Sequence, residues 1–139
     1  MAASADAPVL HARGDLERGD AGGDAPGCRD IIAAQRDGWT EPAIMEWELK
    51  AESWTDWHPH VEYNFVIDGH LYVESGGVTV EARAGDLVSV PAGTVGRYWA
   101  PSYARLLAIY GPNPGLPSRQ LEYRKLAAGD RVKKKTPTG

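Results

Sequence analysis

The central part of the chain alternates short apolar segments with turn residues. In residues 43–49, Met, Trp and Leu alternate with two glutamates, so that one face of the segment is apolar. Segments of the same kind, rich in aromatic and β-branched residues, are 62–67, 71–74, 78–82, 87–90, 96–99 and 105–110. Asp68 and Gly69, and then Gly76 and Gly77, are strong turn signals between them. This spacing of roughly 8–12 residues predicts about seven or eight strands in an antiparallel sandwich or barrel, with any helix confined to the ends.

Length and composition are consistent with one such domain. The 139 residues are 42% hydrophobic and include 16 Gly and 10 Pro, which favours many turns over long helices. Residues 1–28 are rich in Ala, Gly and Asp and are predicted to form a flexible N-terminal arm. We therefore expect the barrel to occupy residues 29–118. A partly disordered C-terminal extension over 119–139, ending in a basic tail, is expected to follow it.

Charge and cysteine content argue against several classes of protein. The net charge of −4 and the isoelectric point near 5.5 argue against a nucleic-acid partner. Cys28 is the single cysteine, which excludes an intramolecular disulfide and fits a reducing compartment. The first residues lack the basic and apolar regions of a secretory signal, and no apolar run approaches the roughly 18 residues that a transmembrane helix needs. A cytoplasmic protein with no membrane partner is expected.

The candidate chemistry lies in one short segment of alternating polar residues. Asp56, His58, His60 and Glu62 occupy every second position, and in an extended chain such side chains share one face, about 6.6 Å apart. Imidazole and carboxylate groups are suitable ligands for Zn, Fe, Mn, Ni or Cu, and two histidines with one carboxylate leave open coordination positions, as a catalytic metal requires. The alternative is a solvated edge strand, which the proline between the two histidines favours.

These motifs, in this order, resemble the cupin family of small β-barrels. The first cupin motif is Gly, five residues, His-x-His, three or four residues, Glu, six residues, Gly, and Glu62 with Gly69 has the spacing of its second half. The second motif is Gly, five residues, Pro-x-Gly, two residues, His, three residues, Asn, and residues 85–93 match its first half. The resemblance covers roughly residues 40–112. It implies an all-β, single-domain cupin, which is a double-stranded β-helix or jelly-roll barrel.

The sequence departs from the cupin motifs at the metal positions. Counting back from Glu62 places the two motif histidines at Asp56 and His58, whereas the second histidine of this chain is His60. One implied ligand set is His58, His60 and Glu62, with the aspartate as a spare carboxylate. The other set uses Asp56 instead of His60, which then stays free for substrate. Gly96 replaces the histidine of the second motif, so that a metal would have one ligand fewer than usual.

Among the cupins, the EutQ-type ethanolamine-utilization proteins look nearest to this chain. That likeness rests on residues 45–48, on the spacing of Glu62 and Gly69, and on residues 101–110. The EutQ type generally lacks the metal histidines, which favours a pocket without metal. This chain, however, has two histidines in the segment concerned.

The resemblance implies a small-molecule enzyme. It would use one divalent transition metal (Zn, Fe, Mn or Ni) as a Lewis acid on an oxygen-bearing substrate, in an isomerase, lyase or cyclase reaction. Tyr98, which shares inward parity with Gly96, and His60 are the candidate catalytic residues that move protons. The alternative for Tyr98 is a core ring. A rival function is a non-catalytic EutQ-like binding module without metal, and a further alternative is an Fe(II)-dependent dioxygenase.

Two expectations concern the surface. A barrel of this size has exposed edge strands, which are usually paired or covered, so that a homodimer is expected. Trp39 and residues 28–36 are the candidates to cross to the partner chain. His70 follows a turn glycine with outward parity and is expected at the surface.

Overall fold

Ten strands make up the regular structure of the part of the chain that the computed structural model describes, which is residues 6–18, 25–34 and 38–127. They are β1 (Glu17–Arg18), β2 (Gly27–Ile32), β3 (Ala43–Leu49), β4 (Glu52–His58), β5 (Glu62–Ser75), β6 (Val78–Arg83), β7 (Leu87–Val90), β8 (Thr94–Ala100), β9 (Ala104–Tyr110) and β10 (Arg119–Lys125). Every strand pairing is antiparallel. The predicted all-β class is therefore confirmed. Over the described ranges there is no helix of the length and apolarity that a membrane span requires.

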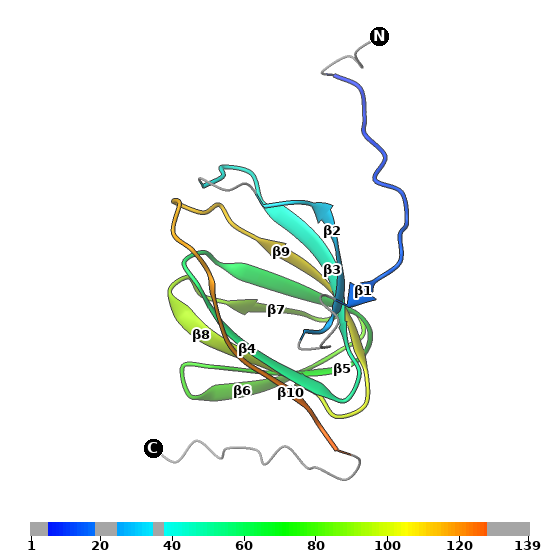
Figure 1. Cartoon of the computed structure of the whole chain (residues 1–139), viewed down its shortest axis with the longest axis vertical. Helices are drawn as coiled ribbons and strands as arrows, with labels where there is room; N and C mark the ends of the chain where they lie inside the picture. Colours follow the sequence, from blue (N-terminus) through cyan, green and yellow to red (C-terminus); the bar gives the residue numbers. More distant parts are fainter. Residues whose placement is uncertain (1–5, 19–24, 35–37, 128–139) are drawn as a thin grey trace.

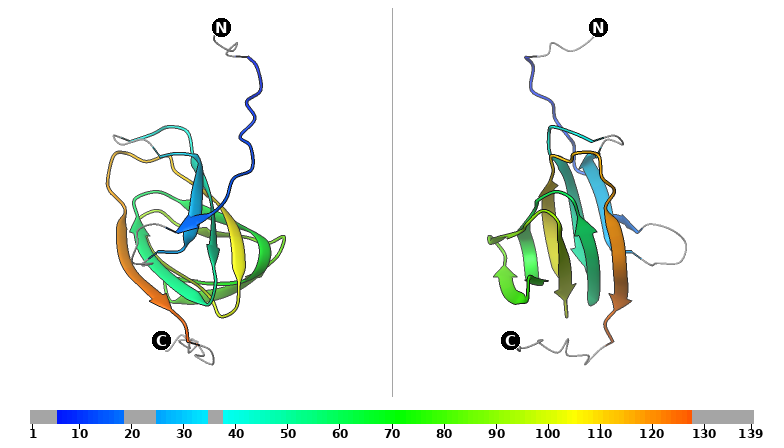
Figure 2. Two further views of the ribbon diagram at one scale, coloured as in Figure 1. Left: turned by 45° about the vertical axis from the view of Figure 1, so that its right-hand side comes forward. Right: turned by 90° about the vertical axis from the view of Figure 1, so that its left-hand side faces the viewer.

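The strands form one curled sheet. Their order is β1-β2-β3-β9-β5-β8-β4-β10, with β6 and β7 both paired to β5. Figures 1 and 2 show this sheet wound around a common interior, with β10 alongside β4 and β2 alongside β3. The first part of β5 pairs with β7 and β9, and its second part pairs with β6 and β8. One strand thus belongs to two walls of the barrel.

The turn predicted at Asp68 and Gly69 is instead a bend within β5. The two strands predicted on either side of it are one strand of 14 residues, whose register with β9 shifts just before the bend. Gly69 has a φ of +82°, and a Cβ atom there would lie 2.1 Å from the carbonyl oxygen of Tyr103. Because glycine alone tolerates both the conformation and the contact, the Asp-Gly pair bends the strand rather than ending it. The second predicted turn, at Gly76 and Gly77, does connect β5 to β6.

Alternate residues of the strands fill the interior. Leu49, Val66, Leu71 and Leu106 are fully buried there. The predicted apolar face of β3 points inward, as the burial of its Trp and Leu shows. On the outward face of the same strand Glu46 is buried as well, because the guanidinium groups of two arginines cover its carboxylate. The core therefore holds in place the strands that carry the polar residues described below.

The sheet extends beyond the predicted barrel limits of 29 and 118. β1 precedes those limits, and β10 pairs with β4 after them. Both terminal strands donate to the buried carboxylate of Glu52: Arg18 Nη1 lies 2.7 Å from its Oε2 atom, and the Tyr123 hydroxyl bonds to the same oxygen. One carboxylate thus ties two terminal strands to the barrel. The basic tail, residues 131–139, lies outside the described residues.

Candidate functional site

Asp56, His58 and Glu62 converge where one strand ends and the next begins. Asp56 and His58 belong to the end of β4, and Glu62 is the first residue of β5. The segment is therefore not one continuous strand, as its alternation suggests. Pro59 follows the last residue of β4, and a proline cannot donate a hydrogen bond to continue the ladder. The short connection at 59–61 brings the glutamate back beside the histidine.

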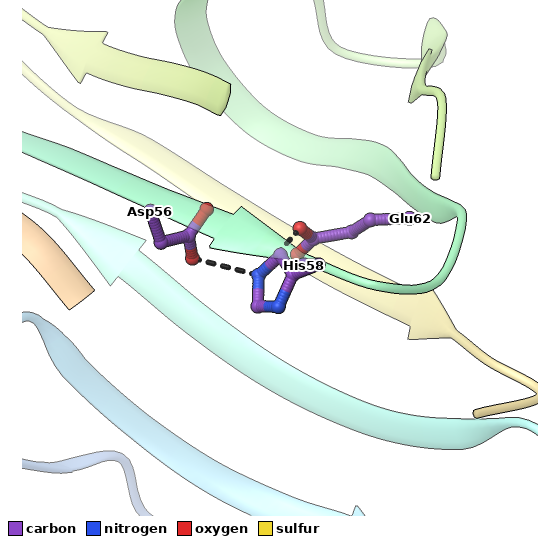
Figure 3. Close-up of side chains that lie close together, drawn as sticks. All are labelled: Asp56, His58 and Glu62. Atoms are coloured by element: carbon purple, nitrogen blue, oxygen red, sulfur yellow. Dashed lines mark ion pairs between the residues drawn. The ribbon is translucent and has the colours of Figure 1, made fainter. Parts of the chain in front are cut away.

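The imidazole of His58 lies between the two carboxylates (Figure 3). Its Nε2 atom is 2.7 Å from Asp56 Oδ2 and 3.2 Å from Glu62 Oε2. The two carboxylates are almost fully buried, and His58 is mostly buried. We call these three residues the triad. They also form the one group among the described residues in which three metal-type donor atoms all lie within 4.8 Å of one another.

Each member of the triad is held by a further side chain. Trp54 Nε1 donates to Asp56 Oδ2 at 2.7 Å, and the Tyr98 hydroxyl donates to Glu62 Oε2 at 3.0 Å. His58 Nδ1 lies 2.7 Å from the hydroxyl oxygen of Ser118, which precedes β10. The second carboxylate oxygen of Asp56, Oδ1, is buried and has no hydrogen-bond partner among the described residues. A buried acceptor without a partner indicates a place for a ligand atom or water.

Burial and charge together set the protonation of this site. Burial alone would lower the pKa of His58, but hydrogen bonds to Asp56 and Glu62, and their charges, outweigh it and raise the pKa to about 10. The ring is therefore an imidazolium at neutral pH. Burial, followed by the charges of Glu62 and Asp56, raises the pKa of Tyr98 far above its usual value. Its hydroxyl therefore stays protonated and donates to Glu62.

His60 lies beside the triad but does not join it. It is buried in the connection after β4, and its ring stacks on His58 with 4.6 Å between ring centroids. Tyr110 stacks on it from 5.1 Å. Burial and then the charge of His58 lower its pKa, so that this second ring is neutral, and its Nε2 atom has no partner among the described residues. Of the two ligand sets left open above, the structure brings together Asp56, His58 and Glu62. A catalytic role of His60 stays a prediction.

On β8, the strand paired with β4, Tyr98 fills the space that Gly96 leaves. Gly96 and Tyr98 are both buried, and a Cβ atom at Gly96 would lie 3.0 Å from the Cε2 and hydroxyl atoms of Tyr98. The missing side chain of Gly96 thus makes room for the tyrosine ring, which then reaches Glu62. The aromatic side chain, and not a second-motif histidine, supports the triad from this strand.

A cavity of about 310 Å³ adjoins the triad. Its walls come from the start of β2, from β3 and from the end of β9, and they include Cys28, Met45, Trp47 and Tyr110. Burial raises the pKa of Cys28, so that its thiol is not ionised at neutral pH. Cys28, Tyr110 and Ser118 are site residues that the sequence does not predict. They lie far from the triad in sequence, and no local motif marks them.

The donor types of the triad, and two of the three separations between its donor atoms, fit a divalent metal ion. In an octahedral site with metal–donor distances of about 2.1 Å, neighbouring donors lie about 3.0 Å apart. The separations of 2.7 and 3.2 Å from His58 Nε2 lie on either side of that value. Imidazole nitrogen and carboxylate oxygen are suitable ligands for transition ions, and three protein donors would leave coordination positions open. The same separations equally suit charged hydrogen bonds to a protonated ring.

Comparison with known proteins identifies the fold family. Residues 43–110 match the cupin domain family. Acetate kinase EutQ of Salmonella typhimurium is 28% identical over 86 residues, which are 62% of this chain but only 37% of that protein. The structure of Clostridium difficile EutQ is 26% identical, with a TM-score of 0.54 over 72% of this chain and 71% of the other. A cupin-like protein from Thermotoga maritima, 14% identical, matches 79% of this chain and 87% of its own with a TM-score of 0.66, which supports the fold alone.

Proposed function

Because this chain is a cupin-domain protein with EutQ proteins among its relatives, we propose that its barrel binds a small molecule beside one divalent metal. The observation that carries the proposal is the convergence of Asp56, His58 and Glu62 on one cavity, with Asp56 Oδ1 buried and unpartnered among the described residues. A metal held there would act as a Lewis acid on a carbonyl or carboxylate oxygen. The reaction class that we propose is isomerisation, elimination or cyclisation.

The surrounding residues would orient the ligands and move protons. Trp54, Tyr98 and Ser118 each hold one member of the triad at hydrogen-bond distance. Tyr98 stays protonated, which suits a donor that positions Glu62. His60 is a neutral imidazole stacked on His58, and it is the neutral form of the ring that can accept a proton. These roles follow from contacts within the chain and are part of the proposal.

The second candidate is a binding module that holds no metal. It is favoured by His58 itself, since a protonated ring between the carboxylates already balances one of their two charges. Gly96, which replaces the histidine of the second motif, supports the same reading. In this case the cavity would bind a ligand without transforming it.

We do not propose for this chain the acetate kinase activity in the name of the Salmonella relative. Phosphoryl transfer depends on cationic side chains and metal ions that stabilise the phosphate oxygens. No Lys or Arg belongs to the described residues that line the cavity. The match also spans only 37% of that relative. A phosphate-binding role of this cavity is therefore disfavoured.

Metal titration of the full chain tests the proposal. After removal of metal with a chelator, the wild-type protein should bind close to one Zn²⁺ or Mn²⁺ ion per chain in calorimetry. His58→Gln should abolish this binding, because it removes the central donor. His70→Gln is the matched control, since His70 is exposed and contacts Glu81 on the outside of the barrel. Absence of stoichiometric binding in the wild type would exclude the Lewis-acid function and favour the binding module.

A further inference from the structure

The described lining of the cavity beside the triad carries charged groups at one place only. Its charged lining residues are the three members of the triad. The remaining wall is mostly apolar and aromatic, and it includes Pro26, Ala34, Trp39, Met45 and Trp47. A ligand in this cavity would thus contact charge at one end and apolar surface over the rest of its body.

Among the indole N–H groups of the described wall, those of Trp47 and Trp54 are used by the protein itself, whereas Trp39 Nε1 is buried without a partner among the described residues. Trp47 Nε1 donates to Asn64 Oδ1 at 2.8 Å, and Trp54 Nε1 donates to Asp56. A ligand with several hydroxyl groups would therefore find few partners for them, and each buried hydroxyl without a partner would weaken binding. Polyhydroxylated molecules such as sugars are poor ligands for this wall.

The charge of the described lining residues disfavours a second class of ligand, the polyanions. The described lining residues include no Lys or Arg, whereas the triad contributes two carboxyl groups. If a divalent ion bound at the triad, these carboxylates would balance its charge and leave no excess positive charge for a polyanion. Phosphorylated or polycarboxylate molecules would therefore be bound weakly in either state.

Resting on the proposed function, we propose that the substrate is a flat, largely apolar molecule with a single oxygen-bearing end. The oxygen end would lie at the triad, and the flat body would lie against the aromatic wall. A dry apolar cavity of about 150 Å³ accommodates benzene. The volume of about 310 Å³ thus has room for a fused bicyclic or substituted ring.

Calorimetric titration of the full chain with two carboxylates tests this inference. The probes are 2-naphthoate, with a flat apolar body, and D-glucuronate, with a hydroxylated one. We expect 2-naphthoate to bind the Zn²⁺-loaded protein at least about tenfold more tightly than D-glucuronate. Met45→Gln places an amide in the wall and should weaken 2-naphthoate binding about tenfold, with Zn²⁺ affinity unchanged. Ile44→Gln is the matched control, because neighbouring residues of a strand face opposite sides and Ile44 does not line the cavity.

The outcomes separate this inference from the proposed function. Zn²⁺ binding with equal or tighter binding of D-glucuronate, or without saturable binding of 2-naphthoate, overturns the inference and leaves the metal site standing. Binding of 2-naphthoate to a protein that takes up no Zn²⁺ supports the apolar substrate class and removes the Lewis-acid function. Equal effects of Met45→Gln and Ile44→Gln would also contradict the inference, because the wall would then not contact the ligand.

Discussion

The protonated His58 predicts that metal binding strengthens steeply as the pH rises. The ring must lose the proton on Nε2 before that atom can coordinate an ion. The pKa near 10 lies about three units above pH 7. Removing the proton at pH 7 therefore costs about 4 kcal/mol, at about 1.36 kcal/mol per unit. Between pH 6.5 and 8.5 the deprotonated fraction rises about tenfold per unit. The apparent affinity for Zn²⁺ should therefore rise about a hundredfold over this range.

A histidine with its ordinary pKa would behave differently. With the usual value of 6.5, the deprotonated fraction changes only about twofold between pH 6.5 and 8.5. The measurement is competition with a chelator of known affinity at several pH values. Calorimetry in two buffers of different ionisation enthalpy should also show close to one proton released per ion. An affinity that is flat over this range, with no proton release, would refute the assignment of His58 as a protonated bridge that becomes a ligand.

The stability of the metal-free protein should change with pH in the opposite direction to its affinity for metal. A folded-state pKa raised above the unfolded value stabilises the fold fully below the unfolded pKa of about 6.5, and this contribution is lost as the pH rises through about 10. The melting temperature of metal-free wild type should therefore fall between pH 6.5 and 10. His58→Gln lacks the titrating ring and should show a smaller decrease. If both proteins lost stability in parallel, the decrease would have to come from other groups.

Three further predictions concern the support of the site, the fold and the assembly. Ser118→Ala should weaken Zn²⁺ binding about 10–100-fold with an unchanged melting temperature, because it removes the partner of His58 Nδ1. Ser118→Thr should restore binding. Equal Zn²⁺ affinities of wild type and Ser118→Ala would contradict this role. Gly69→Ala should lower the free energy of unfolding in urea by about 2 kcal/mol or more beyond the loss in Gly77→Ala. Both glycines have positive φ, but a Cβ atom meets backbone only at Gly69, so equal losses would count against the steric argument. The homodimer stays a prediction, and a monomer in light scattering at micromolar concentration would exclude it.

The sequence predicted those strands whose alternation reflects burial. The segments 43–49 and 87–90 coincide with β3 and β7, because one face of each packs inward or toward a neighbouring strand. β10 was not predicted, since nearly all of its residues are exposed and Leu121 and Tyr123 are its only two apolar positions. It is held by pairing with β4 and by the bond from Tyr123 to Glu52, which are contacts between distant parts of the chain. A local pattern carries no signal for such contacts.

The site was predictable in its residue types but not in its geometry. Asp56, His58 and Glu62 were named as one of two ligand sets, and strand parity alone could not separate that set from the one containing His60. The choice depends on where β4 ends. The strand stops at His58, so His60 lies in the connection and no longer shares a strand face with Asp56 and His58. The hydroxyl of Ser118 could not be found at all, because it reaches His58 from 60 residues away.

The exchange between Gly96 and Tyr98 explains how this barrel can lack the second-motif histidine. A histidine at position 96 would occupy the space that the ring of Tyr98 fills, since even a Cβ atom there lies 3.0 Å from that ring. The tyrosine adds no metal ligand but donates to Glu62 Oε2, the carboxylate atom that also faces His58. This strand thus positions an existing donor of the triad. The proton on His58 and a divalent ion would then compete for one preformed set of oxygens, so that pH and metal concentration together decide which of them the triad holds.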